Sequence, residues 1–119
     1  MRSLDDLFDE FAAALQFPYY FGENWPALDE CLGDLEWIEP HSGLILLVYE
    51  ADQVLTESTN DLPSLVRTIE RAHSVYSQPV NDGEWWDRPA LPFHVVLQLP
   101  VAELDRWIEA GATPSRLLR

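Results

Sequence analysis

The chain has 119 residues, and its 7 basic and 21 acidic side chains give a net charge of −14 at neutral pH. This length is typical of one domain with one core, and 47% hydrophobic residues are typical of a globular chain rather than a disordered one. The charge excludes a nucleic-acid-binding protein, because phosphates would repel it, and it disfavours anionic membrane surfaces. It is compatible with a basic protein partner or with solubility alone.

The single cysteine, Cys31, allows no internal disulfide and no cysteine metal cluster, which is typical of a reducing compartment. Asp5 and Asp6 interrupt the start of the chain, so no signal peptide is indicated, and no apolar run reaches the length of a membrane span. We therefore expect a soluble cytoplasmic protein that needs no cofactor and no metal.

An amphipathic helix is predicted near the start, where apolar residues recur at helical spacing. These residues are Leu4, Leu7, Phe8, Phe11 and Leu15. Ser3 is a good N-cap, and Pro18 ends the helix because proline disfavours helical backbone at the preceding residue. An aromatic loop, residues 17–22, follows.

A second helix begins after Asn24, which can cap it, and Pro26 is tolerated in its first turn. Its predicted buried side consists of Trp25, Leu28, Cys31, Leu32 and Leu35. Asp29 and Glu30 fall away from this stripe, so we expect both to face solvent. The helix is predicted to end near Gly33 and Asp34.

Two strands and two further helices complete the pattern. The continuous apolar run 44–49 predicts a strand covered on both faces, and residues 93–99 predict a second strand. A helix from about Asn60 to Tyr76 separates them, and a last helix over residues 101–108 ends near Gly111. The order helix, helix, strand, helix, strand, helix predicts a small α/β domain.

The segment 77–92 is a long predicted loop that carries Trp85 and Trp86 between Glu84 and Asp87. Long loops are often functional, so the pair could form an aromatic and acidic contact surface or a sugar-stacking platform. We favour instead a loop that folds back, with its tryptophans covering a bare sheet edge, because apolar side chains need cover.

The sequence contains few patterns that are typical of catalysis. The three histidines, His41, His73 and His94, have no metal-type spacing, and no phosphate-binding glycine loop or nucleophile elbow is present. Cys31 has no neighbouring His or basic residue to activate it, so we interpret it as a small buried hydrophobe. Carboxylate pairs are unavoidable among 21 acids, and an acidic hydrolase would need two that face each other in a cleft. We expect no enzyme activity.

Residues 17–32 combine aromatic side chains with carboxylates, which are the ingredients of a binding patch for a basic protein. The same pattern is equally typical of aromatic core residues beside a solvated acidic helix face. Spacing alone leaves both interpretations open.

The same stretch resembles the barstar family, which are inhibitors of the ribonuclease barnase. The matching residues are Pro18, Tyr20-Phe21, Gly22-Glu23-Asn24, Ala27-Leu28, Glu30 and Cys31-Leu32. Gly43 to Leu46 with Glu50, and Phe93 to Leu99, look like two strands of that family. The resemblance implies a barstar-like α/β fold over residues 1–100, with a small parallel sheet packed with about four helices. A C-terminal helix and tail, residues 101–119, would follow.

The resemblance also implies a function: a stoichiometric inhibitor, of immunity or antitoxin type, that plugs the active site of a basic ribonuclease. The carboxylates of the second helix would take phosphate positions against Arg and Lys, with Glu30 at the key acidic position. The partner-binding residues that it implies are Tyr20, Asn24, Glu30, Trp37 and Glu70. Asp29 and Asp34 place further acids on the same helix, so we include both in the expected partner-binding set.

Three departures from the family pattern keep a second hypothesis open. Pro26 replaces an acid, Asp29 replaces a tryptophan, and the residues before Ser3 leave no room for the first strand of the family. Either the sheet is reduced, another segment takes that edge, or the start is misplaced. The alternative function is an interaction module of the same fold that binds a non-nuclease partner.

Overall fold

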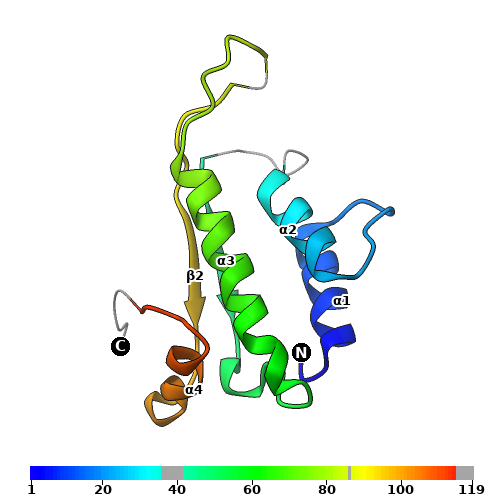
Figure 1. The fold of residues 1–119 in the computed structure, drawn as a ribbon, viewed down its shortest axis with the longest axis vertical. Coiled ribbons are helices and arrows are strands. Elements are labelled where there is room, and N and C mark those ends of the chain that lie inside the picture. The colour runs from blue at the N-terminus through cyan, green and yellow to red at the C-terminus, as the bar shows by residue number, and fades with distance from the viewer. Residues whose placement is uncertain (36–41, 86, 115–119) are drawn as a thin grey trace.

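The computed structural model describes residues 1–35, 42–85 and 87–114 (Figure 1). Helices and strands follow one another in the predicted order, which confirms the α/β class. The elements are α1 (Leu4–Leu15), α2 (Trp25–Asp34), β1 (Leu44–Val48), α3 (Leu62–Ser77), β2 (Phe93–Leu97) and α4 (Leu104–Glu109). Short 3₁₀ helices span Ala51–Gln53, Thr59–Asp61 and Val101–Glu103.

The first helix forms as its spacing predicts. The Ser3 hydroxyl accepts a hydrogen bond from the Asp6 amide at 3.1 Å, and Asp5 and Asp6 lie in the first turn, where the positive end of the helix dipole favours carboxylates. Gln16 ends the helix in a left-handed conformation, with φ 54°. Four residues of the predicted apolar stripe are buried and Leu4 is half-buried, so α1 presents one face to the core.

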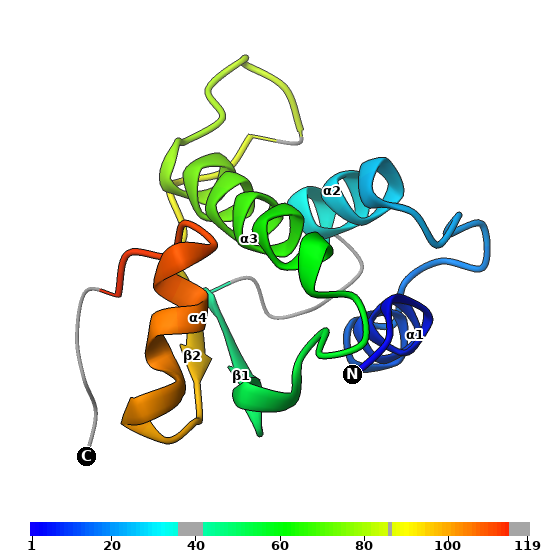
Figure 2. The same cartoon turned by 60° about the horizontal axis from the view of Figure 1, so that its bottom comes forward.

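The two strands pair in parallel, with Leu44 opposite Phe93 and Val48 opposite Leu97, and α3 connects them. Figures 1 and 2 show α3 alongside the sheet, with α2 next to it and α1 further out. The Tyr76 ring of α3 stacks on Phe93 of β2, with 5.4 Å between centroids and 17° between planes. The predicted small parallel sheet is therefore confirmed, and α3 packs against it.

Within the described ranges the sheet has two strands, so no segment takes the place of the first family strand. The carbonyls of Met1 and Arg2 instead accept hydrogen bonds from the Leu55 and Glu57 amides, at 2.8 and 3.0 Å. The start of the described chain is thus tied to the segment that follows β1, and it adds no strand to the described sheet.

The prediction that β1 is covered on both faces is wrong. Ile45, Leu47 and Tyr49 are 68%, 47% and 69% exposed, whereas Val48 is buried. Side chains alternate between the two faces of a strand. The helices pack against one face only, so every second residue of the apolar run points outward.

The C-terminal helix α4 contributes to the same core. Trp107 is 1% exposed, and its indole Nε1 donates to the Ala51 carbonyl at 3.0 Å. The division of the chain at residue 100 stays a prediction, but the packing of Trp107 links both sides of it.

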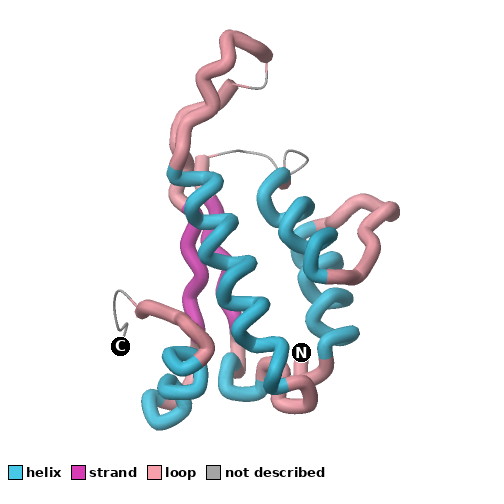
Figure 3. Tube along the Cα trace, in the orientation of Figure 1, coloured by secondary structure: helices cyan, strands magenta, loops and turns pink. Residues whose placement is uncertain are grey.

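The segment between α3 and β2 forms an extended hairpin that projects along the longest axis of the molecule (Figures 1 and 3). Val80 and Arg88 pair across it, and the Asp87 carboxylate accepts from the Asp82 and Gly83 amides at 2.9 and 2.8 Å. Trp85 is 85% exposed, so the expectation that it covers the sheet edge is wrong. The hairpin extends away from the sheet, and Trp86 lies outside the described residues.

None of the helices in the described part of the chain has the length and apolar character that crossing a membrane requires.

Candidate partner-binding site

The aromatic loop between α1 and α2 divides into a packed part and an exposed part. Phe21 makes edge-to-face contacts with Phe17 and Phe8, with centroids 4.9 and 6.1 Å apart, and these rings hold the loop on α1. Tyr19 is fully exposed and Tyr20 is 67% exposed. The loop therefore has two sides: Phe17 and Phe21 are half-buried and pack against the core, whereas Tyr19 and Tyr20 are exposed, and a binding role for the tyrosines stays a prediction.

Asn24 connects this loop to α2. Its Oδ1 accepts from the Ala27 amide at 2.8 Å, and its Nδ2 donates to the Gly22 carbonyl at 3.2 Å. Pro26 occupies the first turn of the helix, where a missing N–H costs nothing. Both polar atoms of the Asn24 side chain are thus hydrogen-bonded within the fold. These hydrogen bonds fix how the loop enters α2.

Glu30 and Asp34 lie exposed on α2, one turn apart. Like charges at this spacing destabilise a helix, and Asp34 in the last turn also faces the negative end of the helix dipole. Burial raises the pKa of the neighbouring Cys31 thiol, and the charges of Glu30 and Asp34 raise it further. This acidic face therefore costs the helix some stability, as do the pairs Asp5/Asp9 and Asp6/Glu10 on α1.

Asp29 is half-buried against α3, and the expectation that it lies on the exposed side of α2 is wrong. Its side chain is 28% exposed, and Oδ2 lies 3.5 Å from Nη1 of Arg71 on α3. Oδ1 is buried without a hydrogen-bond partner. The α2 register places Asp29 one turn after Trp25 on the side that faces α3, so its negative charge is turned into the protein.

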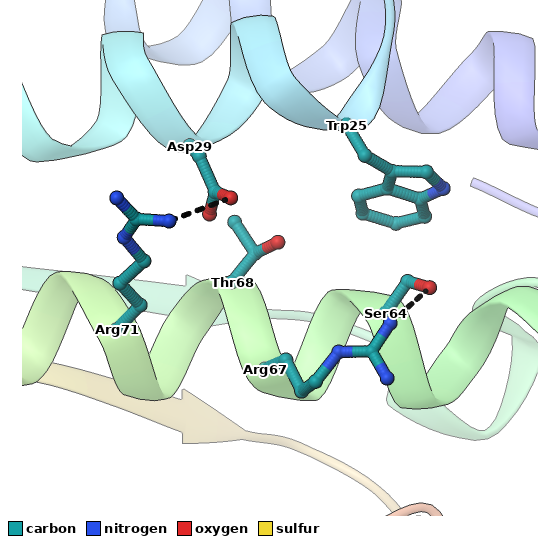
Figure 4. A pocket seen from close by; sticks show the side chains of 6 residues that line it. All are labelled: Trp25, Asp29, Ser64, Arg67, Thr68 and Arg71. Atoms are coloured by element: carbon teal, nitrogen blue, oxygen red, sulfur yellow. Dashed lines mark hydrogen bonds and ion pairs between the residues drawn. The ribbon is translucent and has the colours of Figure 1, made fainter.

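A groove of about 460 Å³ runs between α2 and α3 at this point (Figure 4). It is lined by Trp25, Asp29, Ser64, Arg67, Thr68 and Arg71. The Arg67 guanidinium donates to the Ser64 hydroxyl at 3.1 Å. Neither arginine belongs to the residue set predicted from the sequence, although their spacing of four residues on a predicted helix indicated a shared face.

The remaining predicted site residues are dispersed. Glu70 is exposed on α3 but does not line the groove, and Trp37 lies outside the described residues. Tyr20 lies in the loop before α2, and Asp34 is the last residue of the helix. Of the predicted set, the structure brings Glu30 and Asp34 together.

A second acidic contact joins the loop to α1. Glu23 has a left-handed backbone, with φ 50°. A hydrogen bond to the Asp9 side chain raises the pKa of Glu23, and the charges of Asp9 and Asp5 and a small desolvation add to the rise. The protonated form of Glu23 is therefore favoured beside Asp9, and two ionised carboxyls at this contact would repel each other.

The fold and this surface define a class of protein: a small, acidic α/β protein with a carboxylate-bearing helix that follows an exposed tyrosine loop. Over residues 1–98 the chain matches the model of the family described as Barstar (barnase inhibitor). The chain belongs to this family, which confirms the resemblance noted in the sequence. Comparison with curated proteins and with solved structures gives no match.

Proposed function

We propose that the protein is a stoichiometric inhibitor of a basic ribonuclease, and that it covers the nuclease active site with α2 and the loop before it. Membership of the barnase-inhibitor family supports this function. The observation that carries it is that Glu30, the acid at the key position of the family resemblance, is exposed on α2 with Asp34 one turn away. The protein acts by binding rather than by catalysis.

The mechanism follows from charge and shape. A carboxylate can replace a phosphate oxygen against Arg and Lys, so Glu30 enters the phosphate site of the nuclease and Asp34 contacts its rim. Tyr20 supplies a large exposed aromatic surface that becomes buried in the complex. Trp37 is the second aromatic anchor and Glu70 a peripheral acid, while Asn24 acts by positioning the loop.

The acidic side chains outside the contact surface contribute to long-range attraction of a basic nuclease. The net charge of −14 steers a basic nuclease toward the protein and speeds association at low ionic strength. An inhibitor of this kind protects the cytoplasm of the cell that makes the nuclease, which is an immunity or antitoxin role.

Titration of the purified protein into barnase, and into a basic ribonuclease encoded beside its own gene, tests the proposal. RNA cleavage should stop at one equivalent for at least one of them. Glu30→Gln should weaken inhibition at least about tenfold, since a charge-assisted hydrogen bond is lost. Asp29→Asn is the matched control, one position away on α2, and should inhibit like the native protein. Full nuclease activity at excess inhibitor would refute the function.

A non-nuclease partner is the second candidate, and the α2–α3 groove favours it. Arg67 and Arg71 place two positive charges beside the acidic face, and a uniformly basic target would be repelled there. Affinity capture followed by mass spectrometry, repeated with Glu30→Gln, separates the candidates. A non-nuclease protein captured by the native chain and lost with Glu30→Gln would favour the second.

A further inference from the structure

Two histidines that are distant in the sequence lie together at the edge of the sheet. His73 on α3 and His94 on β2 have ring centroids 5.8 Å apart and planes inclined by 46°. Both side chains are exposed, and α3 and β2 run side by side in Figures 1 and 2. Neither residue has a part in the proposed inhibitor surface.

The protonation of the His73 ring follows from its partner. Nδ1 lies 2.7 Å from the Phe93 carbonyl oxygen. A carbonyl only accepts, so Nδ1 carries a proton and donates it. In the neutral ring the lone pair is therefore on Nε2. The Pro92 carbonyl accepts from Leu44 of β1, so successive carbonyls along β2 direct that of Phe93 to the free edge of the sheet, where His73 reaches it.

This arrangement is typical of a metal-binding histidine. A ligating imidazole usually donates its other N–H to a carboxylate or a backbone carbonyl, which fixes the ring and the tautomer. His73 already has that hydrogen bond in place. From these observations we propose that His73, through Nε2, and His94 bind one divalent transition-metal ion.

The spacing of the rings fits a shared ion. A ring nitrogen binds Zn²⁺ at about 2.0–2.1 Å, which places each ring centroid roughly 3.2 Å from the ion and limits two such centroids to about 6.4 Å. The observed 5.8 Å is within this limit, and it exceeds by about 0.6 Å the roughly 5.2 Å of a tetrahedral N–Zn–N angle, so binding requires a small rotation of the exposed rings. Imidazole ligands select Zn²⁺, Ni²⁺ and Cu²⁺ over Mg²⁺ and Ca²⁺. The described residues include no group of three or more His, Cys, Asp and Glu side chains that could bind one metal ion together. We therefore expect the two histidines to be the protein ligands and water to complete the coordination.

Calorimetric titration with Ni²⁺ and Zn²⁺ tests the site, with Mg²⁺ as the metal that only the carboxylates would attract. The native protein should bind one equivalent of Ni²⁺ or Zn²⁺. His94→Gln should weaken binding at least about tenfold, because the second imidazole is supplied at high effective concentration, and His73→Gln should do the same. His41→Gln is the matched control and should leave the affinity unchanged.

His94→Gln does not alter the hydrogen bond between His73 and Phe93, so it keeps the test decisive if His73→Gln loosens the strand. Nitrogen-15 NMR of the imidazoles adds an independent readout, with the metal-dependent shift expected at Nε2 of His73. No saturable binding by the native protein, equal binding by His94→Gln, or coordination through Nδ1 of His73 would each overturn the proposal.

Discussion

Asp29 and Arg71 face each other across the α2–α3 groove, yet half of the aspartate is left without a partner. Oδ2 lies 3.5 Å from Nη1, Oδ1 is buried without a hydrogen bond, and the arginine side chain is 71% exposed. Desolvation penalises the carboxylate, while an exposed guanidinium returns little energy through a solvent-screened contact. The pair therefore places one negative and one positive charge in the groove and lowers the stability of the fold.

Replacing this carboxylate with an apolar side chain should stabilise the fold. We expect Asp29→Leu to raise the free energy of unfolding by about 1 kcal/mol, because an unpaired buried oxygen is removed. Urea denaturation measures the change. Arg71→Leu should be slightly destabilising in the native chain and neutral beside Asp29→Leu. A loss of stability in Asp29→Leu would show that the ion pair outweighs desolvation.

The contact between Glu23 and Asp9 predicts a pH-dependent stability. The pKa of Glu23 is raised in the folded protein by the hydrogen bond and charge of Asp9, so folding favours the protonated carboxyl. The stabilisation is present at acidic pH and is lost as pH rises through the raised pKa, above the ordinary 4.5. At neutral pH the two carboxylates repel each other.

Glu23→Gln should therefore raise Tm at neutral pH, since its amide donates to Asp9 at every pH. The advantage should shrink as pH falls to about 4. Thermal melts across this range measure it, and Glu10→Gln, an exposed acid on α1, serves as the control. If the difference in Tm were the same at all pH values, the hydrogen bond between protonated Glu23 and Asp9 would not affect stability, and the prediction would be wrong.

Local sequence patterns predicted where the helices and strands lie. Packing between distant segments determines which of their side chains are exposed. The cap of α1 at Ser3, the cap of α2 at Asn24 and the apolar stripes depend on residues within a turn or two, so spacing reveals them. The position of Asp29 depends on where α3 crosses α2, and the exposure of Ile45 depends on which sheet face the helices cover. Neither is contained in a local pattern.

The candidate site divides in the same way. Glu30 is exposed as expected, and Asp34 is exposed as well, because helical periodicity separates both from the buried stripe. The hairpin that exposes Trp85 is held by Asp87: desolvation acts to raise its pKa, but the amides of Asp82, Gly83 and Glu84 outweigh this and hold its pKa below its usual range. In the sequence, the residues of this hydrogen-bond network look like those of any turn. The sequence therefore did not predict that the hairpin extends away from the sheet.

Tyr76 ties α3 to the end of the acidic helix. Its hydroxyl donates to the Leu32 carbonyl at 2.9 Å, and burial raises the pKa of Tyr76 to about 12, with Arg88 acting in the opposite direction. Tyr76→Phe leaves that carbonyl without its donor and should lower stability by about 1–2 kcal/mol. Urea denaturation measures this, and Tyr49→Phe on the exposed sheet face is the control. Equal effects of the two variants would show that the hydrogen bond contributes nothing.

Trp107 determines whether the chain beyond residue 100 is an appendage or part of the core. The indole is 1% exposed and bonded to the Ala51 carbonyl, although the family match ends at residue 98. Trp107→Ala should cost about 3–5 kcal/mol, because it opens a large cavity and removes that donor. Its neighbour Ile108, 46% exposed, provides the control, and Ile108→Ala should cost far less. A chain ending at residue 100 should lose cooperative unfolding in urea. If it unfolds like the native protein, α4 is dispensable and the division at residue 100 is real.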